Sequence, residues 1–212
     1  MSRPTQYARA ERAALCDLFD QLGPDQPTLC TGWLTRDLAA HLVLREGRPD
    51  AAPGILVRRL AGYTARVQRG LAAAPFAYLV ARVRRPPWWS PAAIGPLDRA
   101  INTTEFFIHH EDVRRARPDW QPRPLDPGLA RELWSRLPMT AKLGLGRFPG
   151  TVTLAAEGFG EVVGGAGGPA VRVTGDPGEL LLLASGRPAV ARVEATGDPE
   201  LATRIIQPRF GR

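Results

Sequence analysis

The sequence predicts an α+β protein with a helical N-terminal part at residues 1–120 and a small α+β part at residues 125–212. Two observations support this division. Apolar residues recur at helical spacing in the first half, whereas valine-rich segments with alternating polarity begin only after Pro124. The chain has 212 residues, 44% of them hydrophobic, so it can bury one sizeable core or a larger core beside a small one.

The first two helices are predicted from apolar spacing and from turn residues. Residues 4–22 form an amphipathic helix that ends at Gly23-Pro24. Its apolar stripe consists of Tyr7, Ala10, Ala14, Leu18 and Leu22. A second helix follows Trp33, because Thr35 can cap it and Asp37 places negative charge in its first turn.

The remaining helices of the first half are separated by prolines. Residues 54–84 predict one long helix or two, with a break or kink at Pro75. The proline-rich residues 85–96 predict a loop, and residues 97–116 predict a further helix that Pro118 ends. The residues expected in the core of this half include Leu18, Leu42, Leu60 and Val67.

The second half combines a short helix at residues 127–137 with short strands. The predicted strands are residues 151–155, 161–163, 170–174 and 190–195. Asp176 and Asp198 each precede a proline in two similar stretches, and we interpret both as helix caps rather than ligands. The glycine-rich residues 164–168 predict a hairpin turn and lack the phosphate-loop sequence.

The chain is strongly basic, with a formal net charge of +7 that comes almost wholly from arginine. The arginines either form a solvated surface or attract an anionic ligand. They fall in short groups without a basic tail or a recognised nucleic-acid motif, so we expect a small anionic substrate rather than nucleic acid.

No long uncharged stretch and no apolar secretory signal is present, which predicts a cytoplasmic protein without a membrane partner. Cys16 and Cys30 do not form a CxxC pair, and two cysteines alone make a poor zinc site. We expect both to be reduced, partly buried thiols.

A cluster of acidic and histidine residues stands out in the helix predicted at residues 97–116. On a helical wheel His109 lies about 40° from Glu105, and Asp112 lies about 20° to the other side, so the three share one stripe. His110 lies about 140° away and points elsewhere. A carboxylate on an inward stripe is costly unless a cation or hydrogen bonds compensate it.

Three explanations of this stripe remain open. Glu105 can pair with an arginine, or the histidines can form a buried, hydrogen-bonded pair. The third is a metal ion for which His41, from the second helix, supplies another ligand. Two imidazoles and a carboxylate with an open position are the usual set for catalytic zinc, and they also suit iron or nickel. Asp37 or Asp112 could then orient a ligand imidazole.

Two segments resemble a known family. Residues 30–42, CTGWLTRDLAAHL, resemble the second helix of the DinB-like superfamily, and more narrowly that of the metal-binding domain of mycothiol-dependent maleylpyruvate isomerase. Residues 102–113, NTTEFFIHHEDV, resemble that family's Glu-x-x-x-His-x-x-Asp helix. The resemblance covers roughly residues 5–117 and implies a DinB-like four-helix bundle with His41, Glu105 and His109 as zinc ligands.

The second half also resembles the small α+β domain that follows the bundle in these isomerases, through residues 180–187. The Trp88-Trp89 loop, and the run of His109 to Asp112 followed by Arg114-Arg115, depart from the family pattern and indicate a separate, uncharacterised branch. The resemblance therefore implies a metal site and the use of mycothiol, but not maleylpyruvate isomerisation.

The function expected from these features is a metal-dependent, mycothiol-type S-transferase or isomerase that acts on a small anionic substrate. In this interpretation arginines at the mouth hold the substrate and tryptophans form an apolar wall; the candidates are Arg82, Arg84, Arg187, Trp88 and Trp89. The alternative is that these arginines are surface charges and the tryptophans plug the bundle end. The rival function is a non-catalytic metal-binding sensor or partner-binding module.

Overall fold

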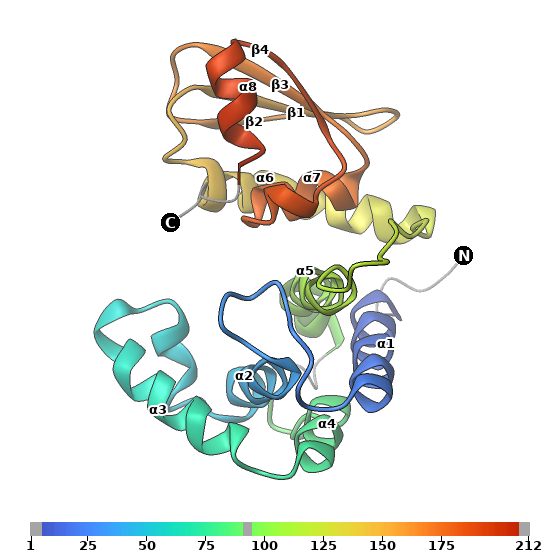
Figure 1. The fold of residues 1–212 in the computed structure, drawn as a ribbon, viewed down its shortest axis with the longest axis vertical. Helices are drawn as coiled ribbons and strands as arrows, with labels where there is room; N and C mark the ends of the chain where they lie inside the picture. Colours follow the sequence, from blue (N-terminus) through green and yellow to red (C-terminus); the bar gives the residue numbers. More distant parts are fainter. Residues whose placement is uncertain (1–5, 91–94, 208–212) are drawn as a thin grey trace. The chain divides into compact units, whose positions relative to one another are not determined.

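The structure, a computed structural model, describes residues 6–90 and 95–207. It divides into two compact units, Met1–Gln121 and Pro122–Arg212. In the described ranges the first unit is helical, and the second combines helices with one four-stranded sheet (Figure 1). The chain is therefore an α+β protein, as the sequence predicts. None of the helices within these ranges is long and apolar enough to cross a membrane.

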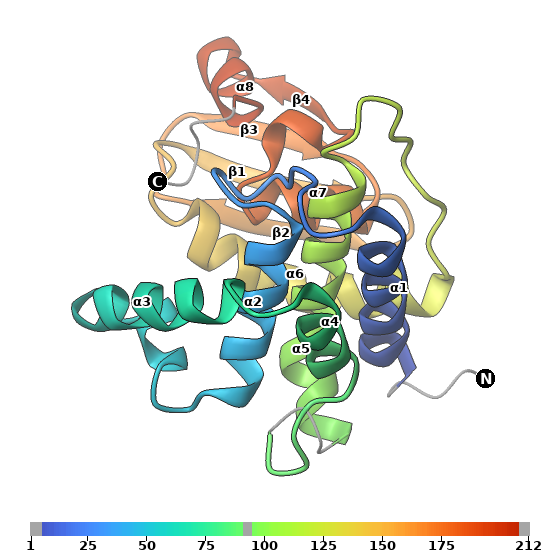
Figure 2. The same ribbon diagram turned by 60° about the horizontal axis from the view of Figure 1, so that its bottom comes forward.

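Five α-helices and two short 3-10 turns make up the first unit as far as it is described. They are α1 (Gln6–Leu22), α2 (Thr35–Gly47), η1 (Ala52–Ile55), η2 (Arg58–Leu60), α3 (Ala61–Ala72), α4 (Phe76–Arg84) and α5 (Gly95–Arg114). Helices α1, α2, α4 and α5 share one core, to which Phe19, Leu42, Leu79 and Phe106 contribute. Helix α3 packs on α2, on the side away from α1 (Figures 1 and 2).

The buried face of α1 differs from the predicted stripe. Leu15 and Phe19 are fully buried, whereas Ala10 is exposed and Leu18 only half-buried. Glu11 and Arg12 also face the interior, where Glu11 contacts His110 and Arg12 pairs with Glu46. The predicted stripe therefore holds only in part: Leu18 and Leu22 pack against the core, but the most buried face of α1 also includes two charged residues that an apolar pattern does not select.

The segment predicted as a helix from residue 54 begins its α-helix only at Ala61. A Cβ added at Gly54 would lie 2.0 Å from Thr64 Oγ1 and 2.6 Å from the Leu60 carbonyl oxygen, so the chain folds back tightly here. Leu60 is 44% exposed and Val67 is half-buried, so neither is a core residue, whereas Leu42 is fully buried. The break at Pro75 is confirmed, since α4 starts directly after it.

The second unit combines three α-helices with a mixed sheet. Its elements are α6 (Pro127–Leu145), β1 (Thr151–Ala156), β2 (Gly160–Gly165), β3 (Ala170–Thr174), α7 (Pro177–Ala184), η4 (Pro188–Val190), β4 (Glu194–Gly197) and α8 (Pro199–Ile205). The strand order is β2-β1-β3-β4, and only the central pair, β1 and β3, is parallel. Leu154 on β1 lies opposite Val162 and Val173, and all three side chains are buried.

Three predictions for this unit need correction. Helix α6 continues past Pro138 to Leu145, because burial of Leu137, Ala141 and Leu145 offsets the hydrogen bond that an internal proline removes. Strand β4 starts at Glu194 rather than at residue 190, since Pro188 begins a 3-10 turn. Residues 164–168 do not form a hairpin turn, because β2 and β3, which they link, lie on opposite sides of β1.

Helix N-termini follow the sequence in part. Asp198 caps α8 by accepting a hydrogen bond from the Leu201 amide at 3.0 Å, as predicted. Asp176 stands at the N-cap position of α7 without a side-chain cap bond. Helix α5 begins two residues before the predicted position, and the predicted loop before it falls partly on residues 91–94, outside the described residues.

Candidate metal centre

Three side chains predicted as metal ligands converge between α2 and α5. Nε2 of His109 lies 3.2 Å from Oε1 of Glu105, and Nε2 of His41 lies 3.7 Å from the same oxygen. One ligand atom from each residue lies within 4.8 Å of the other two. Four ligands at zinc–nitrogen and zinc–oxygen bond lengths stand about 3.3 Å apart in a tetrahedron, so the cluster has the dimensions of a single-metal site.

The local sequence explains how α2 presents His41. Leu34 occupies the N-cap position, and its amide donates to the carboxylate of Asp37 at 3.0 Å, so the predicted cap at Thr35 was wrong. Leu38 and Leu42 bury one face of the helix in the core, which leaves His41 at the edge of the core. The ring of Trp33 lies against His41, with 5.1 Å between ring centroids.

The other side of the His109 ring is held by Asp112. Nδ1 of His109 lies 2.9 Å from Oδ2 of Asp112, on the next turn of α5. A proton on Nδ1 then leaves Nε2 as the atom that faces Glu105 and His41. Asp112 thus occupies the orienting position that the sequence suggested for it, whereas Asp37 caps α2 instead.

Cys30 is the residue near the cluster that sequence reasoning missed. Its thiol donates to Oδ2 of Asp112 at 3.2 Å and lies 4.0 Å from Nδ1 of His109. The contact arises because the loop before α2 folds onto the end of α5, where the Leu29 amide donates to the Asp112 carbonyl. Cys30, His109 and Asp112 form a second group with metal-ligand spacing.

The electrostatics of the cluster follow from burial and hydrogen bonds. Burial lowers the pKa of His41 and so favours its neutral, metal-binding form. Burial would raise the pKa of Glu105, but hydrogen bonds with His109 and His41 hold that pKa well below its usual range. Burial would lower the pKa of His109, but Asp112, Cys30 and Glu105 hold it well above its usual range.

Arg45 also reaches the cluster. Its Nε lies 3.3 Å from Oε1 of Glu105, and Nη1 donates to Oδ1 of Asn102 at 2.5 Å. Glu105 therefore faces an arginine as well as two imidazoles. The ion pair that the sequence left open is present, together with the three-residue cluster.

A buried polar network lies beside the cluster and connects three helices. The guanidinium of Arg12 on α1 makes two hydrogen bonds with Glu46 on α2, at 2.5 and 2.6 Å. Asn102 on α5 donates to Glu46 at 2.9 Å and to Asp98 at 2.7 Å. Since Asn102 also contacts Arg45, the network continues to the Glu105 carboxylate.

His110 does not join the cluster, in agreement with the helical wheel. Its Nδ1 lies 2.9 Å from Oε2 of Glu11 on α1, and both side chains are buried. The adjacent histidines of α5 therefore face different helices. His109 faces His41 on α2, with 5.5 Å between ring centroids.

The other predicted binding residues contact different neighbours. Arg84 pairs with Asp17 at 2.8 Å and with Asp20 at 2.7 Å, and Arg82 lies over the ring of Tyr78. Trp88 is 87% exposed and Trp89 46%. Arg187, in the second unit, donates a hydrogen bond to the Ser185 carbonyl. Their part in binding stays a prediction.

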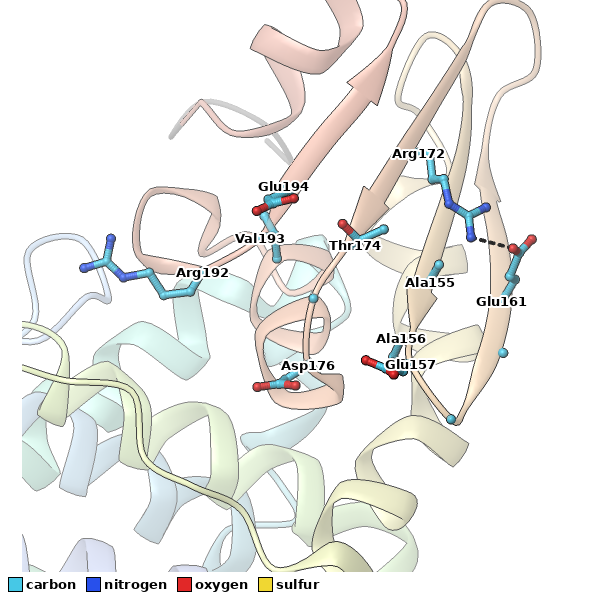
Figure 3. Close-up of a pocket in the computed structure, with 13 residues that line it drawn as sticks. Ala155, Ala156, Glu157, Glu161, Arg172, Thr174, Asp176, Arg192, Val193 and Glu194 are labelled. Carbon is cyan, nitrogen blue, oxygen red and sulfur yellow. Dashed lines mark ion pairs between the residues drawn. The ribbon is translucent and has the colours of Figure 1, made fainter.

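The second unit carries an open pocket of about 860 Å³ that the sequence did not indicate (Figure 3). It lies at the carboxyl ends of the parallel strands β1 and β3. Its charged lining residues are Glu157, Glu161, Arg172, Asp176, Arg192 and Glu194. Four of these side chains are carboxylates and two are guanidinium groups. One of the two guanidinium groups, that of Arg172, pairs with Glu161 at 2.6 Å.

Comparison with known proteins supports the fold. No family model and no curated protein matches the chain. A crystal structure of a mycothiol-dependent maleylpyruvate isomerase is similar, with a TM-score of 0.57, 16% identity and 92% of each chain covered. A mutant of that enzyme with one histidine replaced by alanine gives a TM-score of 0.54 at the same identity and coverage. The chain therefore has the fold of this isomerase, which is the fold that the resemblance in its sequence implied.

Proposed function

We propose that His41, Glu105 and His109 bind one divalent metal ion. Zinc is the first candidate, and nickel and iron are the alternatives. The observation that carries this proposal is the convergence of two imidazoles and one carboxylate from two helices, with all three ligand atoms within 4.8 Å. The contact between Asp112 and His109 adds support, because metal-bound histidines usually donate their second nitrogen to a carboxylate.

We further propose that the chain is an enzyme that uses a low-molecular-weight thiol of the mycothiol type on a small anionic substrate. A metal in this site would supply Lewis-acid chemistry and lower the pKa of a bound thiol or water. His41, kept neutral by burial, and Glu105, kept ionised, would hold the ion, while Asp112 orients the ring of His109. Arginines remain the candidates for binding the anionic group of the substrate. The full set of proposed binding residues is Arg82, Arg84, Arg187, Trp88 and Trp89.

A non-catalytic metal-binding module is the second candidate. Arg45 favours it, because a guanidinium 3.3 Å from the Glu105 carboxylate leaves less room for a substrate at the metal. Cobalt substitution separates the two functions. An open site gives the absorption and relaxation signature of an exchangeable water, whereas a site closed by four protein ligands does not.

Metal content tests the site itself. We expect the protein to bind one zinc ion per chain and His109→Ala to lose most of it. His110→Ala is the matched control, because the neighbouring ring contacts Glu11 and not the cluster. Elemental analysis after dialysis measures both variants. Equal loss in the two would contradict the proposed ligand set.

Thiol use needs a separate experiment. Calorimetric titration with mycothiol should give binding to the zinc-loaded protein and none to the metal-free protein. Mycothiol binding that is unaffected by removal of the metal would contradict the proposed use of the thiol at the metal. It would not affect the proposal of the metal site. A zinc-loaded protein without mycothiol binding would favour the non-catalytic module.

A further inference from the structure

A long segment of the first unit contains no acidic residue. From Ala51 to Leu97 the sequence holds no aspartate or glutamate, although aspartates flank it at both ends. Seven arginines lie within it: Arg58, Arg59, Arg66, Arg69, Arg82, Arg84 and Arg85. A protein with both charge signs elsewhere thus has one continuous segment that is only positive.

The first part of this segment also exposes large aliphatic side chains. Leu56 is 92% exposed, Val57 47% and Leu60 44%, and Ile55 beside them is exposed as well. They lie on the two 3-10 turns and the residues between them, directly before α3. Single exposed leucines are ordinary, but four exposed aliphatic residues within six positions are a concentration of apolar side chains.

The exposed arginines lie among and directly after these residues. Arg58 and Arg59 interrupt the aliphatic stretch, and Arg66 and Arg69 follow on α3; all four are exposed. The carboxylate of Asp50, just before the segment, is occupied by Arg48 at 2.7 Å and by the Tyr63 hydroxyl at 2.6 Å. We call residues 55–69 the Leu-Arg surface.

Helix α3 makes few contacts of its own with the core. Of its twelve residues only Thr64 and Ala72 are buried. It lies on the outer side of α2 in both views of the bundle (Figures 1 and 2). The Leu-Arg surface is therefore at the edge of the first unit, where an extended flat partner can reach it.

We propose that the Leu-Arg surface binds the surface of an anionic lipid bilayer. The aliphatic side chains would enter the interfacial region, while the arginines keep their guanidinium groups at the lipid phosphates. Basic residues near such a surface are attracted by its negative potential, and aliphatic side chains gain from leaving water. The protein would lie on the membrane without crossing it.

Other partners fit this surface less well. A second copy of the chain would bring arginines against arginines, because the segment carries no carboxylate to pair with them. Nucleic acid would match the positive charge, but its phosphate backbone offers no apolar surface to cover Leu56 and Val57. An anionic bilayer is the partner that accounts for both the charge and the aliphatic side chains. This inference does not rest on the proposed metal site.

Vesicle co-sedimentation tests the proposal on the full chain. We expect binding to vesicles that contain phosphatidylglycerol, at least tenfold tighter than to pure phosphatidylcholine, and weakening as salt rises. The double variant Leu56→Ser/Val57→Ser should bind at least tenfold more weakly, and so should Arg58→Gln/Arg59→Gln. Leu143→Ser and Arg147→Gln, exposed residues of the second unit, are matched controls and should bind like wild type.

Several results would overturn the proposal. These are no binding to phosphatidylglycerol vesicles at low salt, or unchanged binding by Leu56→Ser/Val57→Ser. Tighter binding to duplex DNA than to vesicles, unaffected by the serine variant, would assign the surface to nucleic acid. A concentration-dependent dimer in sedimentation analysis that the serine variant abolishes would assign it to a second copy. All variants change exposed side chains, and circular dichroism checks that each is folded.

Discussion

Asp112 and Glu105 contact opposite nitrogens of the His109 ring, and the balance between them determines when a metal can bind. Nδ1 faces Asp112 at 2.9 Å, and Nε2 faces Glu105 at 3.2 Å. These carboxylates raise the pKa of His109. The metal-free ring therefore keeps both protons at pH values where an ordinary histidine has lost one. A metal must therefore displace the proton on Nε2, and proton and metal compete for one atom.

Zinc affinity should accordingly increase as the pH rises through the raised pKa of His109. Asp112→Asn removes the strongest hydrogen bond that raises this pKa, so the rise should occur at lower pH. At high pH the same variant should bind zinc about 10-fold more weakly, because the ring is less well oriented. Competition with a chelating dye across a pH series measures both effects.

Asp37→Asn is the control for this experiment. Its carboxylate accepts from the Leu34 amide at the start of α2 rather than from a ligand imidazole. The pH profile of zinc affinity should therefore stay that of the wild type. If Asp112→Asn and the wild type give superimposable profiles, Asp112 does not control the protonation of His109.

At the scale of the helix, α1 is joined to α2 and α5 by charge as well as by packing. Arg12 is buried, pairs with both oxygens of Glu46, and lies 4.1 Å over the ring of Phe106. A buried ion pair adds little compared with well-packed apolar residues. Removal of one partner, however, leaves an uncompensated buried charge.

Arg12→Leu should therefore destabilise the protein by about 3 to 5 kcal/mol. Arg12→Leu/Glu46→Leu should recover part of this loss, because no unpaired charge remains at position 46, while the buried carboxylate of Asp98 still loses its contact with Arg12. Arg84→Leu is the exposed control, since its pairs with Asp17 and Asp20 are solvated and contribute less than about 1 kcal/mol. Urea unfolding measures all three; a loss for Arg12→Leu no larger than that for Arg84→Leu would contradict the prediction.

Helices α5 and α1 show why the sequence pattern predicted the directions of the α5 side chains more accurately than the buried face of α1. The spacing of Glu105 and His109 and the separate direction of His110 depend only on helix geometry, which a wheel describes. The buried face of α1 depends on Glu11 and Arg12, whose partners lie on distant segments. An apolar pattern cannot identify charged residues that are buried in pairs.

Tertiary contacts through loops escaped prediction for a similar reason. Cys30 reaches Asp112 because a turn folds back between Pro27 and Leu34, and no spacing along the chain indicates this. Leu60 fits the helical pattern after residue 54, but the chain folds back tightly at Gly54 and the α-helix begins only at Ala61. Local propensity gave most helices and strands, and long-range packing set their ends and faces.

Helices α6 and α7 cross closely at a glycine. A Cβ at Gly144 would lie 1.8 Å from the Ala184 carbonyl oxygen, which is backbone and cannot rotate away. Gly144→Ala should force the helices apart and destabilise the second unit by about 1 to 3 kcal/mol. Gly70→Ala on α3 meets no atom within 4 Å and should stabilise by up to about 1 kcal/mol. Thermal unfolding of both variants tests the crossing, and a neutral Gly144→Ala would refute it.

At the scale of the whole chain, the two units have different tasks in the proposed function. Met1–Gln121 contains every proposed metal ligand, and Pro122–Arg212 contains the sheet. Each unit also has buried apolar residues of its own, such as Phe106 in the first and Leu182 in the second. We propose that the units act as separate domains. A ligand that binds only the folded first unit then stabilises that unit by mass action.

Hydrogen exchange with and without zinc tests this division. At free zinc about 100 times the dissociation constant, the stabilisation is about 2.7 kcal/mol, so exchange by unfolding of the first unit should slow about 100-fold. Amides in α2 and α5 should show this slowing, whereas those in β1 and β3 should exchange as before. His109→Ala should remove the effect of zinc in the helices. Equal slowing in the sheet would mean that the two units unfold as one, and that zinc stabilises the whole chain rather than its own domain.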